Sequence, residues 1–223
     1  MLAKSEITDS IIYSTETFFS GLVSIGFYIF IANYLSLTDM GAYALAIAYA
    51  SIFAGMANFG LSAGYERTFF EFLDSPEEKG SLIASVQSFA IVSIILFLAI
   101  GIYFSSQLTL LLFGNTQYQY LWIFMLVGVN ISEFSKFYFI FLKNTRQAKL
   151  FASLHAIQVA LNFLLAYVFL VLLNKGIEWL GLALLISHTF VFVWSYINQI
   201  CNLPNIINIS VFKMVASLSF PLT

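Results

Sequence analysis

The strongest chemical signal in this sequence is a pair of ionisable residues inside a long apolar segment. Glu133 and Lys136 interrupt the segment 118–142, and residues three positions apart face the same side of a helix. A charge within hydrocarbon is costly unless it is paired or wetted. The two side chains therefore either neutralise each other as an ion pair, or Lys136 attracts an anionic group while Glu133 takes up a proton.

Other apolar segments carry polar residues at helical spacing. His155, Gln158 and Asn162 share one helix face, while Glu16 and Asn58 each belong to a polar stripe on another segment. Small polar residues in such stripes allow close helix packing, but long polar side chains pack poorly. We therefore expect several of these residues to line a water-filled cavity for a polar solute. The alternatives are that His155 is simply hydrogen-bonded and that Glu16 reaches the membrane interface.

The composition indicates the environment in which these residues must be positioned. Of the 223 residues, 61% are hydrophobic and 9% are charged, whereas a soluble domain has about 25% charged residues. The mean hydropathy is +0.92. Such a surface suits lipid rather than water, so the sequence predicts an integral membrane protein.

Several classes of chemistry lack support in the sequence. Cys201 is the single cysteine, which excludes a disulfide framework and a multi-cysteine metal site. The sequence has no H-E-x-x-H, G-x-S-x-G or P-loop motif. We therefore expect no enzymatic activity, no metal, no cofactor and no binding of nucleic acid.

Six segments are long enough to cross a hydrocarbon core about 30 Å thick, which takes about 20 residues of helix. The predicted spans are approximately 11–35, 40–65, 82–104, 118–142, 151–173 and 178–200. Together they form one predicted transmembrane unit over residues 1–213. A seventh apolar run, 214–223, is too short to cross and is expected to begin a further, truncated span.

Helix start and turn signals separate the spans. Ser75-Pro76-Glu77-Glu78 combines an N-cap serine, a proline at the first helical position and a capping-box glutamate. This sequence predicts the start of the third span or of a short helix that leads into it. Gly114-Asn115 and Lys175-Gly176 indicate turns.

The basic residues predict the orientation. With the N-terminus in the cytoplasm, Lys175 is the one basic residue on an external loop, and Lys136 lies within a span. The remaining seven then fall on cytoplasmic segments: Lys4, Arg67, Lys79, Lys143, Arg146, Lys149 and Lys213. The positive-inside rule favours this arrangement. A cytoplasmic rim of this kind would also attract a phosphorylated lipid head group.

Four short stretches resemble the N-terminal half of the polysaccharide transporters, a branch of the multidrug/oligosaccharidyl-lipid/polysaccharide exporter superfamily that includes the O-antigen (Wzx-type) flippases. The similar stretches are Leu35-Ser36-Leu37-Thr38-Asp39-Met40-Gly41-Ala42-Tyr43-Ala44-Leu45, Phe59-Gly60-Leu61 followed by Arg67, the pair Gly176 and Gly181, and Phe220-Pro221-Leu222. Singly these motifs are degenerate, but together they extend over nearly the whole chain.

The resemblance implies an all-α fold, namely one six-helix lobe of a MATE-like transporter whose C-terminal lobe is missing. It implies that the whole protein flips an undecaprenyl-diphosphate-linked oligosaccharide from the cytoplasmic to the periplasmic leaflet of the bacterial inner membrane. The expected partners are this lipid-linked substrate, membrane lipids and a coupling ion, H⁺ or Na⁺, that acts at a carboxylate such as Glu133. Of the family's basic cavity residues, Arg67 alone has a counterpart here.

Three alternatives remain open from the sequence. A multidrug-type exporter would need an aromatic, acidic cavity, and the many Phe and Tyr residues are compatible with one. An intramembrane polymerase or ligase of glycan assembly usually carries a large external loop, whereas the longest here, 105–117, is mostly apolar. A membrane scaffold without transport activity is the third.

Overall fold

The protein is a bundle of helices. The computed structural model describes residues 2–70, 75–202 and 207–219, and this described part contains no strand. The elements are α1 (Leu2–Ala32), α2 (Leu37–Asn58), α3 (Leu61–Phe69), α4 (Pro76–Tyr103), α5 (Ser105–Phe113), α6 (Gln119–Asn144), α7 (Ala148–Tyr167), the π-helical turn η2 (Val168–Leu172), α8 (Glu178–Asn202) and α9 (Ile209–Ser219).

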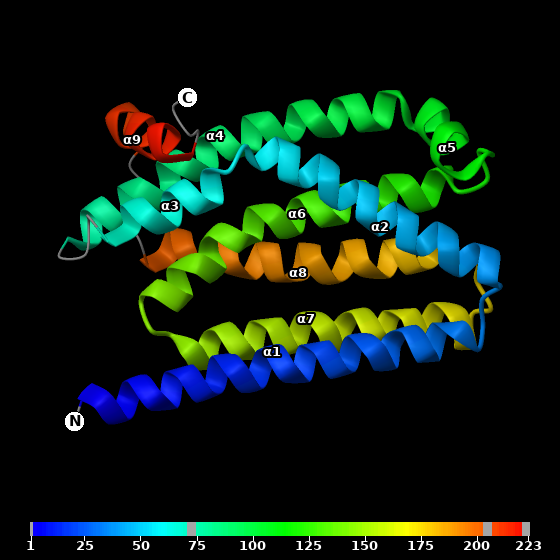
Figure 1. The fold of residues 1–223 in the computed structure, drawn as a ribbon, viewed down its shortest axis with the longest axis horizontal. Helices are drawn as coiled ribbons and strands as arrows, with labels where there is room; N and C mark the ends of the chain where they lie inside the picture. Colours follow the sequence, from blue (N-terminus) through cyan, green and yellow to red (C-terminus); the bar gives the residue numbers. More distant parts are fainter. Residues whose placement is uncertain (1, 71–74, 203–206, 220–223) are drawn as a thin grey trace.

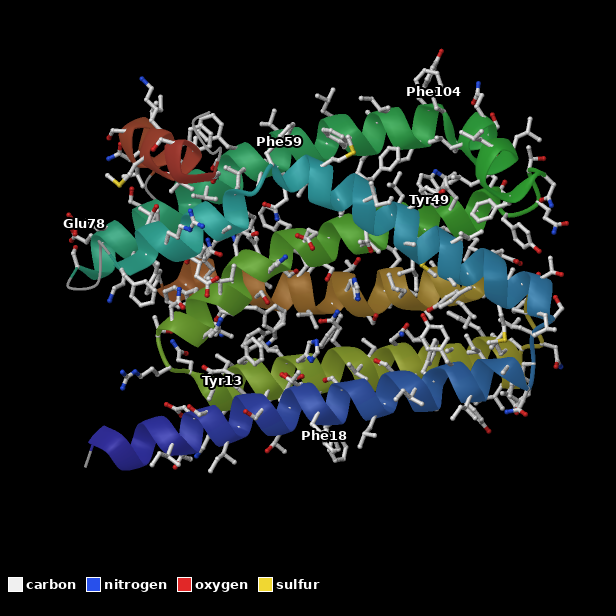
Figure 2. All side chains as sticks on the ribbon, viewed as in Figure 1. Tyr13, Phe18, Tyr49, Phe59, Glu78 and Phe104 are labelled. Carbon is white, nitrogen blue, oxygen red and sulfur yellow. The ribbon has the colours of Figure 1, made fainter. Side chains whose placement is uncertain are left out.

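Six helices are long and apolar enough to cross a membrane: α1, α2, α4, α6, α7 with η2, and α8. Large apolar side chains cover much of the outer surface; Phe18 on α1 is 67% exposed, and both it and Phe104 point away from the bundle (Figure 2). Such a surface requires lipid around it. The prediction of an all-α, multi-pass membrane protein is confirmed.

The helices α6 and α8 form the centre of the bundle, and they pack closely along their length (Figure 1). Gly128 on α6 allows this approach, because a Cβ atom there would lie 2.7 Å from Leu184 and 3.1 Å from the backbone of Leu185. α1 and α7 run side by side along one edge, while α4 lies at the opposite edge. The two largest apolar cores lie at opposite ends of this arrangement, around Phe137 and around Met125.

The second predicted span, 40–65, is interrupted in the structure. α2 ends at Asn58, and Phe59 (φ 48°) and Gly60 (φ 72°) take left-handed conformations before α3 begins. Glycine adopts this conformation without a steric penalty, and a left-handed residue is a common helix end. The Asn58 side chain spans the break, since its Oδ1 accepts a hydrogen bond from the Ser62 amide at 3.0 Å.

α9 docks against α3 and α4 at the end of the bundle where the N-terminus lies (Figure 1). The Ser85 hydroxyl accepts a hydrogen bond from the Asn208 amide at 2.7 Å, and the rings of Phe89 and Phe212 stack with centroids 3.4 Å apart. The predicted seventh run, 214–223, therefore begins inside α9. The Phe220-Pro221-Leu222 motif lies outside the described residues.

The predicted start of the third span is confirmed. α4 begins at Pro76, and the Ser75 hydroxyl accepts a hydrogen bond from the Glu78 amide at 3.3 Å. The predicted external loop 105–117 instead contains α5, which ends at Phe113 and is followed by the left-handed Gly114. The apolar character of that segment is explained by this extra helix.

The basic residues predicted to be cytoplasmic gather at one end of the bundle. The segments that carry them are α3, the start of α4, the end of α6, the start of α7 and α9, and they lie at the same end as the N-terminus (Figure 1). Lys175 lies at the opposite end, near the Trp179 ring. This arrangement is the one that the positive-inside rule requires, and the orientation itself stays a prediction.

Candidate functional site

A polar pocket of about 290 Å³ lies between α6 and α7. Four of the eight residues singled out from the sequence line it: Glu133 and Lys136 from α6, and His155 and Gln158 from α7. We call it the α6–α7 pocket. It combines both signs of charge with an imidazole and an amide.

Glu133 is the centre of a small network in this pocket. Its Oε2 accepts a hydrogen bond from Asn58 Nδ2 at 2.9 Å, and Lys136 Nζ lies 3.5 Å from the same oxygen. The Glu133 side chain is 25% exposed and that of Lys136 is 51% exposed. The distance of 3.5 Å is long for a hydrogen bond between charged groups, and the Lys136 ammonium group is open to the pocket. Another anion can therefore compete for that ammonium group.

Lys143 is a further pocket residue whose role in the pocket the sequence reasoning missed, since it was interpreted as a topology signal. It lies seven residues after Lys136, which places both ammonium groups on one face of α6, two turns apart. Its Nζ donates a hydrogen bond to Glu66 Oε1 of α3 at 3.1 Å. The spacing of seven was the signal that could have revealed it.

His155 connects the pocket to α1. Its Nδ1 contacts a carboxylate oxygen of Glu16 and lies 3.0 Å from Ser20 Oγ, which itself donates a hydrogen bond to Glu16 at 2.6 Å. The Glu16 side chain is only 9% exposed. Glu16 therefore turns inward to His155 rather than out toward the interface. The imidazole packs against the rings of Phe151 and Phe139, which also contact each other.

A second, smaller pocket of about 190 Å³ continues from the first. Gln158 lines both pockets, and Asn162 and His188 line the second. His188 Nδ1 lies 3.0 Å from the Gly128 carbonyl oxygen, and Asn162 Oδ1 is buried without a hydrogen-bond partner among the described residues. The polar residues of α7 thus form a continuous polar track along the inner face of that helix.

Arg67 is not part of this assembly. It lies exposed on α3 and does not line the α6–α7 pocket, although its neighbour Glu66 binds the pocket residue Lys143. Of the sequence candidates, the structure therefore brings Glu133, Lys136, His155 and Gln158 into one pocket. Asn58, Glu16 and Asn162 adjoin it, and Arg67 lies apart.

A buried amide pair was also missed from the sequence. Gln199 of α8 donates a hydrogen bond to Gln87 of α4 at 2.7 Å, and both side chains are buried. Gln87 and Gln199 each stand in an apolar segment and were not part of a stripe of polar residues at helical spacing. Because the pair lies away from the α6–α7 pocket, we interpret it as a contact that fixes α4 against α8.

Within the ranges 2–70, 75–202 and 207–219, the structure contains no group of three or more His, Cys, Asp or Glu side chains that could hold a metal ion. What the site can do is bind an anion through Lys136 and Lys143, and bind or release a proton at a carboxylate or imidazole.

No family model and no curated protein matches the sequence. Among solved structures, the chain is similar to a MOP (multidrug/oligosaccharidyl-lipid/polysaccharide) superfamily transporter from Pyrococcus furiosus. That transporter is described as having a binding pocket of reverse polarity, which suggests a different function for it. The TM-score is 0.72 at 14% sequence identity, over 97% of this chain and 51% of that one. The likeness shows the fold, so the prediction of a MATE-like six-helix unit is confirmed. The chain spans about half the length of that transporter.

Proposed function

We propose that this chain is one half of a transporter that flips an undecaprenyl-diphosphate-linked oligosaccharide from the cytoplasmic to the periplasmic leaflet by alternating access. The fold, the sequence resemblance and the charged α6–α7 pocket support the proposal. The observation that carries it is the pocket, where Lys136 and Lys143 face the same space among apolar helices. The two ammonium groups supply two positive charges for the negative charges of a diphosphate. A second six-helix half would close the site from the other side.

Glu133 supplies a means of coupling to an ion. With Glu133 ionised, its carboxylate competes with the substrate for Lys136. When a proton neutralises Glu133, this competition ends and the pocket becomes more positive, which favours the anionic head group. A Na⁺ ion at the same carboxylate would act similarly. Release of the ion restores the ion pair and weakens substrate binding, so the ion controls how tightly the head group is held.

The test uses the full protein, with both halves, in a flippase-deficient strain. Lys136→Ala removes an ammonium group from the pocket, and Glu133→Gln fixes the neutral state. We expect Lys136→Ala to reduce surface polysaccharide about tenfold or more, the effect of losing one charged contact of about 1.5–3 kcal/mol. We expect Glu133→Gln to reduce it as well, because the head group is then not released. Lys149→Ala is the matched control, because Lys149 is exposed at the same end of the bundle but does not line the pocket. An unchanged amount of surface polysaccharide in both pocket variants would refute the mechanism.

A multidrug-type exporter is the second candidate, favoured by one observation. The rings of Phe139 and Phe151 flank the pocket beside Glu133, an arrangement that suits an organic cation. This function predicts the opposite response to charge: Lys136→Ala should improve resistance to cationic dyes, because it removes a repulsive charge. The response of the Lys136→Ala variant therefore separates the two candidates.

A further inference from the structure

A small polar cavity lies where α4, α6 and α8 meet, and none of its lining residues lines the α6–α7 pocket. Its volume is about 10 Å³. The polar residues that line it are Gln87 from α4, Ser135 and Tyr138 from α6, and Ser195 and Gln199 from α8. Each of these five residues is at most 5% exposed. The cavity therefore gathers polar side chains deep inside the bundle. We call it the α4–α6–α8 cavity.

Two buried polar atoms at this cavity have no hydrogen-bond partner in the part of the chain that the structure describes. Gln199 donates through Nε2 to Gln87, but its Oε1 accepts no hydrogen bond, and the Ser195 hydroxyl makes none either. The two residues are four positions apart on α8, so they lie on one face of that helix. Because both line the cavity, it is the space in which their hydrogen bonds can be completed.

The Ser195 hydroxyl differs in this respect from several other serines of the spanning helices. Ser51, Ser88 and Ser135 each donate to the backbone carbonyl oxygen four residues earlier. This local bond is a common way for a serine within a helix to satisfy its hydroxyl. Ser195 makes no such bond in the structure. Its hydroxyl hydrogen is therefore available to a partner in the cavity.

The size and polarity of the cavity indicate a single water molecule as its occupant. A buried water needs at least about 10–15 Å³ and makes about three hydrogen bonds, and it occupies polar cavities whereas apolar ones stay dry. None of the described residues that line this cavity is charged, so no side chain would offset the charge of a buried ion. Ser195, Gln199 and a hydroxyl group from α6 supply the three partners that one water requires.

We propose that the α4–α6–α8 cavity binds one water molecule that hydrogen-bonds to Ser195 and Gln199. The water accepts the hydrogen of the Ser195 hydroxyl and donates one of its own to Gln199 Oε1. Its second hydrogen is available to a hydroxyl oxygen of α6. The bridge adds α6 to the direct contact between Gln87 and Gln199, and a water-mediated contact is nearly as favourable as a direct one. This site does not depend on the proposed function.

The first test is hydroxyl-radical labelling of the full protein in lipid nanodiscs by brief X-ray exposure, with mass spectrometry as the readout. The radicals form from water and react close to their origin, so a buried ring is labelled where a water is held beside it. Phe134 lines the cavity and Phe141 does not, although both belong to α6 and both are 7% exposed. We expect Phe134 to be labelled severalfold faster than Phe141. Equal rates would overturn the proposal.

A substitution that fills the cavity should remove this difference. Ser195→Val replaces the hydroxyl by methyl groups that occupy the space of the water. Ser187→Val is the matched control, because Ser187 is also buried on α8 but donates to the Leu184 carbonyl oxygen and does not line the cavity. The labelling rate of Phe134 should fall to that of Phe141 in Ser195→Val and stay at the wild-type rate in Ser187→Val. A wild-type rate in Ser195→Val would count against the bound water.

The second test is the melting temperature of Ser195→Ala, because a dry and a hydrated cavity predict opposite signs. In a dry cavity the variant removes an unsatisfied hydroxyl, and Tm rises. With the water bound it removes a hydrogen bond, and we expect Tm to fall by about 2–4 °C. A rise in Tm would overturn the proposal. So would a wild-type Tm that increases in NaCl but not in choline chloride and loses this response in Ser195→Val, because the cavity would then hold a cation.

Discussion

The contact between α3 and α9 gives a sharp prediction about Gly64. The backbone of α9 approaches this glycine so closely that a Cβ atom would overlap the Ser219 hydroxyl and lie 2.6 Å from the Val215 carbonyl oxygen. Gly55, exposed about one turn before the end of α2, offers the matched control, because a Cβ atom there would have no neighbour within 4 Å. We therefore compare Gly64→Ala with Gly55→Ala.

The same chemical change should have opposite effects at the two positions. Alanine is favoured over glycine in a helix by about 0.5–1 kcal/mol, and Gly55→Ala should stabilise the protein by that amount. At Gly64 this gain is opposed by overpacking, which costs about 1–3 kcal/mol, because α9 must move away. The two variants should differ by about 2 kcal/mol in the free energy of unfolding. For a chain of this size, that difference is about 4–8 °C in Tm.

The assay is thermal unfolding in detergent, together with hydrogen exchange of the α9 amides. Gly64→Ala should melt below the wild-type protein and exchange faster in α9, while Gly55→Ala should melt above it. Adding Ser219→Ala should restore part of the loss, since the overlap with the hydroxyl disappears but the contact with the Val215 carbonyl remains. Equal melting temperatures for the two glycine variants would refute the close approach of α9.

Three further predictions follow from contacts in the bundle. Asn58→Leu should destabilise the protein by about 1–3 kcal/mol, because the Ser62 amide and the Glu133 carboxylate each lose their hydrogen bond to Asn58. A loss of less than about 0.5 kcal/mol in the free energy of unfolding in urea would contradict this. In a double-mutant cycle, Glu16→Ala and His155→Ala should show a coupling of about 0.5–3 kcal/mol in the free energy of unfolding. If the losses of stability of the two single variants simply add, the two side chains do not interact in the membrane. Reporter fusions at Gly114 and Gly176 should both report the periplasm, and cytoplasmic signals at both would overturn the orientation.

The sequence was most informative where helical periodicity alone decides the outcome. The lengths of the apolar segments predicted the helices that cross the membrane, and the spacing of His155 and Gln158 placed both side chains on one face of α7. The 3.6-residue period determines which residues of a helix share a face, but it does not determine which helix that face meets. For this reason the contact between Glu16 and His155, 139 positions apart, came from the structure and not from the sequence.

Two misreadings had a local cause. The span predicted over 40–65 counted apolar residues and overlooked that Asn58-Phe59-Gly60 is a helix-ending sequence. Lys143 was assigned to topology because it is close to the membrane boundary, although its spacing from Lys136 also placed it in the pocket. A basic residue near a helix end can serve both roles, and for Lys143 the spacing of seven residues from Lys136 was the sequence signal of the second role.

The break after α2 has a consequence for the lipids that this protein tolerates. α2 has 22 residues and is therefore about 33 Å long, which matches a hydrocarbon core of about 30 Å with little room for tilt. The next helix packs beside the last turns of α6 and carries Glu66 and Arg67. In bilayers of much longer acyl chains, these charges would be drawn below the head groups unless the bilayer thins around them. The protein should accordingly prefer membranes of ordinary thickness, and its activity should fall in vesicles built from lipids of increasing chain length.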